Sequence, residues 1–269
     1  MIRLTLRARP PMRLSLRDFI PERLAGLSAS AIARQTLRQG NRPGVLGDLF
    51  AVDVSAGAED RLVIDGPDER LDDVGAGMSS GDLVVEGNVG ARVGLEMSGG
   101  RISVRGSASV GAGTAMSGGE LRIVGDAGDH IGTALPGERH GIRDGVVIVE
   151  GAAGAGVGDR MRRGLIVIVG AVGPFCGARM AAGTIVVVGK LGASAGAAMR
   201  RGTVIALGQS EAQLPGFVDS GVHDLTVQRL LVRMLERHRI VEPLDRLQSL
   251  RRWQGDLAVG GKGEILTAP

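Results

Sequence analysis

Short apolar runs recur at nearly constant spacing along the middle of the chain. In "GRISVRG", Ile102 and Val104 alternate with Arg101, Ser103 and Arg105. Such period-two alternation is typical of a β-strand with one buried face. The same two apolar positions recur in six more segments, as Leu83 and Val85, Leu121 and Ile123, Val147 and Val149, Ile166 and Ile168, Ile185 and Val187, and Val204 and Ala206. The pattern therefore predicts seven short strands.

Glycine follows the same period as these strands. The motif Met97-Ser-Gly-Gly returns 19 residues later as Met116-Ser-Gly-Gly, and one glycine column runs through Gly81, Gly100, Gly119, Gly145, Gly164, Gly183 and Gly202. Its single longer interval, 26 residues, reflects a seven-residue insertion, "LPGERHG", at 135–141. A fixed period near 20 residues is the signature of stacked repeats, and glycine at corners permits positive φ and close contact between units.

The predicted fold class is an all-β solenoid. We expect a right-handed parallel β-helix of about seven 19-residue coils, because stacked strands must keep identical registers and parallel connections are nearly always right-handed. Two further columns should face inward: a Met/Ile column, and an Ala/Val column of Val89, Ala108, Ala127, Ala153 and Val172. The Met/Ile column comprises Met78, Met97, Met116, Ile142, Met161, Met180 and Met199.

The ends of the chain break the repeat and predict a small N-terminal α/β cap and a C-terminal helix. Alternation at 2–6 and again at 12–16 predicts a hairpin, and apolar residues at three-to-four spacing predict a helix over 222–238. The expected organisation is a capping segment at 1–60, the β-helix at 61–210 and a helix with a tail at 211–269.

Composition narrows the functional classes. Four Phe, one Trp and no Tyr leave few aromatic side chains to stack on bases, so nucleic-acid binding is not expected although 32 basic residues face 29 acidic ones. A single cysteine, Cys176, excludes an internal disulfide and a thiolate cluster. Without an 18-residue apolar run or a secretory signal, no membrane contact and a cytoplasmic location are expected.

The residues predict neither a catalytic nor a metal site in this chain. The glycine-rich "GDLAVGGKG" is not a phosphate loop, because Asp256 stands where the leading glycine is needed and Gly263 replaces the Ser or Thr that binds magnesium. The four histidines lack ligand spacing, and no nucleophile with an adjacent base is evident.

The glycine repeat carries a family resemblance. It is similar to the repeat shared by the C-terminal domain of glutamate synthase large subunits and by the C subunits of formylmethanofuran dehydrogenases. The flanking segments "FIPERLAG", "QGNRPGVLGDLFAVD" and "GDLAVGGKGEI" resemble the second family over almost the full chain. With only two lysines and no tyrosine, the chain most resembles the member from methylotrophic bacteria, the C subunit of the formyltransferase/hydrolase complex.

That resemblance implies a non-catalytic scaffold subunit. Its partners would be amidohydrolase-like and formyltransferase subunits, which move a formyl group between tetrahydromethanopterin and a methanofuran-type coenzyme and release formate, while this chain binds no cofactor itself. One alternative is the C subunit of a formylmethanofuran dehydrogenase. A second is a stand-alone β-helical carbohydrate-active enzyme, although one Trp and no Tyr leave few sugar platforms. A hexapeptide acyltransferase is excluded, because 19 is not a multiple of six.

Three surface features are candidate contacts. Outward strand positions of the later repeats are apolar, and we expect the 222–238 helix, a partner subunit or both to cover them: Val146, Ile148, Leu165, Val167, Val186, Val188 and Ile205. The insertion tip, Glu138, Arg139 and His140, is a candidate partner contact. A column of arginines is expected to meet an acidic subunit surface, a polyglutamyl coenzyme tail or solvent: Arg143, Arg160, Arg162, Arg163, Arg179, Arg200 and Arg201.

Overall fold

The computed structural model describes residues 1–40, 42–55, 57, 60–66, 68–210, 215–223, 228–238, 240 and 249–268. Its elements, in chain order, are β1 (Ile2–Leu6), β2 (Leu14–Ser15), α1 (Pro21–Leu24), α2 (Ala29–Ala33), β3 (Thr36–Gln39), β4 (Arg42–Val45), α3 (Leu46–Leu49), β5 (Phe50–Val54), β6 (Arg61–Asp65), β7 (Leu71–Asp72), β8 (Asp82–Val85), β9 (Arg101–Val104), β10 (Ser117–Ile123), β11 (Asp144–Val149), β12 (Leu165–Ile168), β13 (Thr184–Val187), β14 (Thr203–Ala206), β15 (Val218–His223), α4 (Gln228–Arg237), β16 (Leu250–Gly255) and β17 (Gly263–Thr267).

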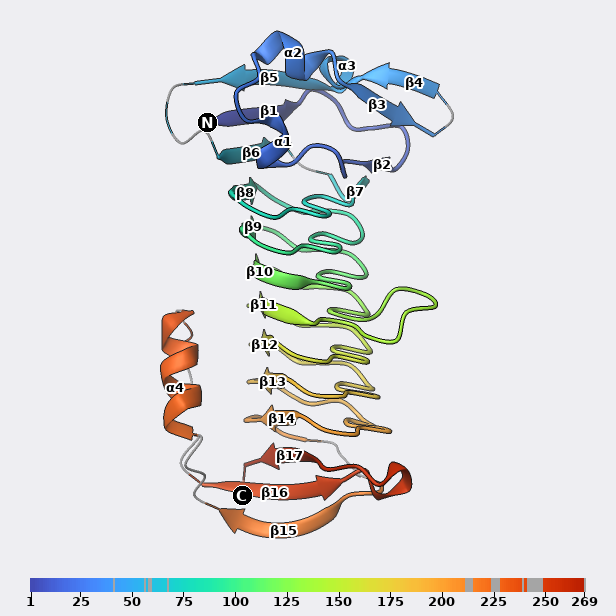
Figure 1. Cartoon of the computed structure of the whole chain (residues 1–269), viewed down its shortest axis with the longest axis vertical. Helices are drawn as coiled ribbons and strands as arrows, with labels where there is room; N and C mark the ends of the chain where they lie inside the picture. Colours follow the sequence, from blue (N-terminus) through green and yellow to red (C-terminus); the bar gives the residue numbers. More distant parts are fainter. Residues whose placement is uncertain are drawn as a thin grey trace.

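The predicted strands stack as neighbours in one large sheet. Its order is β15-β16-β17-β14-β13-β12-β11-β10-β9-β8-β6-β1-β5, and Figure 1 shows the strands following one another along the long axis. Pairing from β1 through β6 and β8 to β14 and β17 is parallel. Equivalent residues of successive repeats lie side by side, so that Ile102 is flanked by Leu83 and Leu121. Each 19-residue repeat is called a repeat unit below.

The prediction of an all-β solenoid, a right-handed parallel β-helix of about seven coils, was wrong. The described strands that form the large sheet give one open, mixed sheet of 13 strands, mostly parallel, with few helices. Between successive strands the chain forms turns and a single bridged residue per unit, as in the row from Val89 through Ala108 to Ala127. The physical reason is the glycine content, because the left-handed turns that glycine permits interrupt the extended backbone before a second multi-residue strand can form.

The ends of the sheet also differ from expectation. Segments 2–6 and 12–16 do not form a hairpin: β1 lies between β5 and β6, and β2 pairs in parallel with β7 instead. Strands β1 and β5 therefore extend the sheet, and β5 pairs antiparallel. At the other end β17, β16 and β15 continue the sheet in antiparallel pairs. The division at residues 60 and 210 stays a prediction.

The inward-facing rows are confirmed. The side chains of the Met/Ile column are 0% exposed, and the strand positions represented by Ile102 and Val104 are equally buried. Gly100 shows why glycine precedes each strand: its φ is +76°, and an added Cβ would lie 2.7 Å from the carbonyl oxygen of Gly81 one unit earlier. Any larger residue there would force the units apart.

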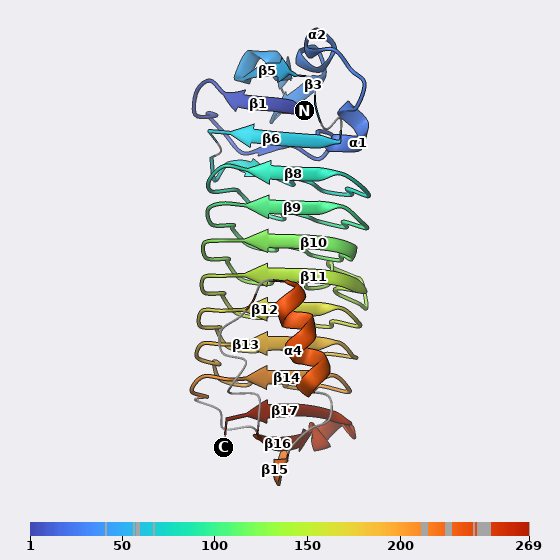
Figure 2. The ribbon, with the colours of Figure 1, turned by 90° about the vertical axis from the view of Figure 1, so that its left-hand side faces the viewer.

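Helix α4 lies against the outer face of the sheet. Figure 2 shows it crossing in front of β12–β14, and Figure 1 shows it beside the same strands. The predicted 222–238 helix is thus found at Gln228–Arg237; residues 224–227 lie outside the described residues, as do the side chains of Leu230 and Met234. Within the described chain, none of the helices has the length and apolar character that crossing a membrane requires.

Candidate functional site

A groove lined by arginine lies at the corner that precedes β12, β13 and β14. We call it the basic groove, with a volume of about 620 Å³ and a lining of Arg143, Arg162, Arg163, Ala181, Ala182, Gly183 and Arg201. It arises from successive tetrapeptides "IRDG", "MRRG", "MAAG" and "MRRG", in which the first residue is buried and the next two reach the surface. The small residues of the third tetrapeptide lie between two arginine pairs, which leaves the groove open.

Backbone hydrogen bonds set the stacking of this corner. Arg143, Arg162, Ala181 and Arg200 each donate an N–H to the carbonyl of the Met or Ile one unit earlier, at 2.8 or 2.9 Å. They form one row across four units, at about 4.8 Å per unit. Residues one position further along, including Arg163 and Arg201, form the adjacent row. The groove arginines are therefore held on a rigid, regularly spaced backbone.

Ion pairs with other described residues do not engage the arginines of the basic groove, although the exposed Asp144 lies at the same corner and accepts a hydrogen bond from the Gly145 N–H. Arg143, Arg162, Arg163, Arg200 and Arg201 are exposed, and none of them forms an ion pair or side-chain hydrogen bond with another described residue. In water, two guanidinium groups repel by about 0.4 kcal/mol at about 10 Å and by about 0.9 kcal/mol at the spacing of about 4.8 Å between neighbouring units, so solvent tolerates the arrangement. Arginine presents a planar fork of donors that matches a carboxylate or phosphate. The groove can thus bind an anion.

Two of the predicted arginines lie in a different groove. Arg160 and Arg179 line a cavity of about 460 Å³ together with the start of the insertion, and we call this the insertion-loop groove. Arg179 Nε donates to Asp159 Oδ1 at 2.8 Å, and this hydrogen bonding raises the pKa of Arg179. Arg160 Nη1 donates to the backbone carbonyl of Glu138 at 2.9 Å. The structure therefore separates the predicted arginine column into two sites: in the insertion-loop groove, Arg179 has an ion pair and Arg160 a hydrogen bond to backbone, whereas the arginines of the basic groove have neither with other described residues.

The insertion projects from the stack between β10 and β11 (Figure 1). Glu138 and Arg139 are exposed, and His140 is half-buried. The Glu138 N–H donates to the carbonyl of Leu135 at 2.9 Å, which closes a turn at the tip. With Arg160 bound to the Glu138 carbonyl, the loop is attached to the next repeat unit and presents its charged tip outward.

The predicted apolar outer face is buried beneath helix α4. Ile148, Leu165, Val167, Val186 and Ile205 are at most 4% exposed, and Val146 and Val188 are half-buried. They pack with Leu231, Leu235, Ile240, Leu250 and Leu266 in a cluster separate from the main core. A contact of this face with a partner subunit stays a prediction.

Polar contacts that the sequence analysis missed attach the end of α4 to the sheet. His238 Nδ1 lies 3.0 Å from Glu120 Oε2, and Arg122 donates to the His238 backbone carbonyl. Arg122 also pairs with Glu150 at 2.7 Å. Since Glu120 and His238 are 118 residues apart, no local sequence pattern signals this contact.

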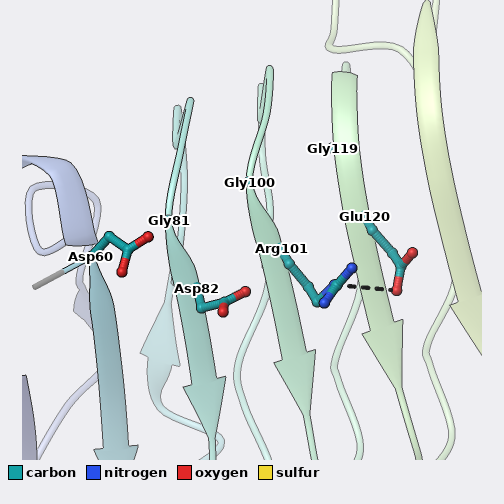
Figure 3. A pocket seen from close by; sticks show the side chains of 7 residues that line it. All are labelled: Asp60, Gly81, Asp82, Gly100, Arg101, Gly119 and Glu120. Carbon is teal, nitrogen blue, oxygen red and sulfur yellow. Dashed lines mark ion pairs between the residues drawn. The ribbon is translucent and has the colours of Figure 1, made fainter. Parts of the chain in front are cut away.

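The same strand-start edge has mixed charge in the earlier units. A cavity of about 440 Å³ is lined by Asp60, Asp82, Arg101, Glu120 and the glycines Gly81, Gly100 and Gly119. Figure 3 shows Asp82, Arg101 and Glu120 on the successive strands β8, β9 and β10, with Arg101 and Glu120 joined by an ion pair of 3.6 Å; Asp60 precedes β6. The charged residues on these three strands directly follow the glycine column, whereas the arginines of the basic groove directly precede it, where Asp144 is the one carboxylate of the four tetrapeptides.

A buried carboxylate pair joins the N-terminal segment to the first repeat unit. Asp72 and Asp73 are 8% and 7% exposed; Arg13 binds Asp72 and Arg92 binds Asp73, the latter at 2.7 Å. Burial raises the pKa of Asp73, but hydrogen bonds from Arg92 and Ser15 outweigh burial and hold it below its ordinary value. Their role is structural, since both carboxylates are satisfied by neighbouring side chains.

Few of the described residues are candidates for binding a metal ion or for acting as a nucleophile. In that part of the chain, no group of three or more His, Cys, Asp or Glu is placed to hold a metal ion. Cys176 is fully buried, and burial raises the pKa of its thiol to about 12. Because the thiolate is the reactive form, Cys176 is not an active nucleophile in the folded chain.

Comparisons with known proteins identify relatives of this chain. No family model matches the sequence. Over 90 residues it is 44% identical to the C subunit of the formyltransferase/hydrolase complex (Fhc) of Methylorubrum extorquens, an alignment that spans 34% of this chain and 33% of that relative's length. The structure is similar, with a TM-score of 0.92 and 43% identity, to a chain in the crystal structure of the formyltransferase/hydrolase complex (FhcABCD) from M. extorquens in complex with methylofuran, over 99% of both chains. The chain therefore belongs to the family of formyltransferase/hydrolase complex C subunits.

Proposed function

We propose that this chain is a non-catalytic scaffold subunit of a formyltransferase/hydrolase complex in one-carbon metabolism. The observation that carries the proposal is the match to a chain of the solved complex over 99% of both chains. In the proposed complex, other subunits move a formyl group between tetrahydromethanopterin and a methanofuran-type coenzyme and release formate. The crystallised relative, in complex with methylofuran, supports the coenzyme class.

The chemistry of the described residues agrees with a scaffold role. The buried Cys176 thiol is not reactive, and the buried Asp72 and Asp73 are engaged by arginines rather than facing a cavity. The basic groove is lined by arginines and small residues, and the insertion-loop groove by arginines together with Asp159, His130 and apolar side chains such as Leu135. Such surfaces suit binding, and the proposed amidohydrolase-like and formyltransferase subunits supply the reacting groups.

The contacts proposed for assembly lie on three surfaces. The basic groove offers unpaired guanidinium groups, and the insertion tip offers Glu138, Arg139 and His140. Beside α4, the half-buried Val146 and Val188 leave part of the apolar outer face accessible to a partner. A stiff stack of paired strands holds these surfaces at fixed separations, which is what a scaffold must do.

Reconstitution tests the proposal. The complex is prepared with this chain, without it, and with the purified chain added back, and its assembly and its formyl transfer and hydrolysis are measured. We expect the isolated chain to show no turnover, and its omission to dissociate or inactivate the complex until it is added back. Turnover by the chain alone, or full assembly and activity without it, would contradict the scaffold function.

A further inference from the structure

The basic groove differs from the rest of the repeat in how its arginines are paired. In the earlier units Arg92, Arg101, Arg105 and Arg122 each form an ion pair with a carboxylate of a neighbouring unit. In the later units the five arginines at and beside the groove have no such partner among the described residues. The groove arginines are therefore available to carboxylates of another molecule.

The floor of the groove explains its shape. Ala181 and Ala182 occupy the two outward positions that arginines occupy in the units before and after. The space of two arginine side chains is thereby left open between Arg163 on one side and Arg201 on the other. Since the two arginine-bearing units are two unit spacings apart, these side chains begin about 10 Å from each other.

The length of the arginine row suits a ligand with several carboxylates. A single carboxylate between Arg163 and Arg201 leaves Arg143, about 15 Å from Arg201 along the stack, unpaired. In an extended peptide, side chains at alternate residues point the same way and are about 7 Å apart. Two such carboxylates can therefore pair with Arg163 on one side of the groove and Arg201 on the other. The arginines from Arg143 to Arg201 span about 15 Å along the stack, the length of four or five extended residues.

We propose that the basic groove is the docking site for an extended acidic segment of a neighbouring subunit, held by at least two carboxylates. This rests on the proposed function, in which the chain is assembled with other subunits. Charge complementarity and the match between arginine spacing and an extended chain favour a polypeptide. Contacts of this kind weaken as salt screens them, so docking is expected to depend on ionic strength.

Carboxylate cross-linking in the full complex identifies the occupant. Arg163→Lys and Arg201→Lys place an amine at the groove, which a carbodiimide couples directly to a carboxylate in contact with it. We expect mass spectrometry to find both positions joined to one Asp- or Glu-containing peptide of another subunit. Arg38→Lys, an exposed position on β3, is the control and should not give that product. Coupling to a second copy of this chain, or to no partner peptide, would overturn the proposal.

Charge reversal tests the energetic role. We expect Arg163→Glu with Arg201→Glu to weaken the partner's binding at least tenfold and to lower the salt concentration at which the complex dissociates. The exposed pair Arg34→Glu with Arg38→Glu carries the same charge change away from the groove and should leave assembly unaltered. Unchanged assembly with slower turnover would instead assign the groove to a small polycarboxylate and refute the subunit contact. If omission of the whole chain still disrupts the complex while groove variants do not, only this inference fails.

Discussion

Replacing Leu235 by alanine is expected to release helix α4 from the outer face without unfolding the sheet. Leu231, Leu235 and Ile240 are 5%, 1% and 6% exposed, and they pack on the row that contains Val167 and Val186. Burial of three such side chains contributes about 6 kcal/mol. A helix of ten residues is marginal by itself, so α4 depends on this contact to stay folded.

The expected magnitude follows from the burial of Leu235. A Leu→Ala change at a buried site costs about 2–5 kcal/mol, and a loss near 3 kcal/mol should raise the opening of α4 about 100-fold. Hydrogen–deuterium exchange measures this directly: peptides from α4 should lose protection while β12, β13 and β14 keep theirs. Binding of a hydrophobic dye should rise as the apolar face is uncovered.

A matched control lies on the same helix. Glu236 is exposed, and Glu236→Ala should leave the exchange of α4 within about twofold, because alanine is a good helix former and no packing is lost. Equal loss of protection in α4 and in the strands after Leu235→Ala would show that the helix is part of one cooperative core. Unchanged exchange of α4 would show that Leu235 does not hold it, and either result would refute the reasoning.

Three further outcomes follow from particular contacts. Gly118→Ala should destabilise the chain by about 2–3 kcal/mol in thermal or denaturant unfolding, because the new Cβ would lie 2.2 Å from the Ser98 carbonyl oxygen. As the control, Gly137→Ala should cost about 1 kcal/mol, because its Cβ would meet nothing within 4 Å and only the φ of +86° is unfavourable. Equal losses of stability in the two variants would contradict the stacking argument. The thiol of Cys176, with its pKa raised to about 12, should resist alkylation at pH 8 until denaturant is added, and rapid labelling of the native chain would contradict its burial. Asp73, whose folded pKa is lowered, should contribute stability above about pH 4 that is lost as pH falls through that pKa, so Asp73→Asn should flatten the acid limb of a stability curve; an unaltered limb would show that its ion pair contributes little.

The sequence by itself determined where the strands begin and which side chains are buried. Ile102 and Val104 show the reason, because side chains alternate along any strand and stacked units must repeat the same alternation. The methionine column and the glycines before each strand follow from the same requirement. The apolar outer positions such as Val167 also signalled a covered face, since a strand that is apolar on both sides is buried on both.

Only the tertiary structure decided how these strands are assembled and where the charges meet. The expected parallel β-helix is instead one open, mixed sheet, because the turns allow a single bridged residue between strands and antiparallel strands pair at both ends. Arg179 precedes the buried Met180, whereas the groove arginines follow the Met/Ile column, so Arg179 lies in a different groove, where it pairs with Asp159. His238 meets Glu120 across 118 residues. Local patterns record which face of a strand is apolar, whereas the pairing of distant segments depends on the path of the whole chain, which no local pattern contains.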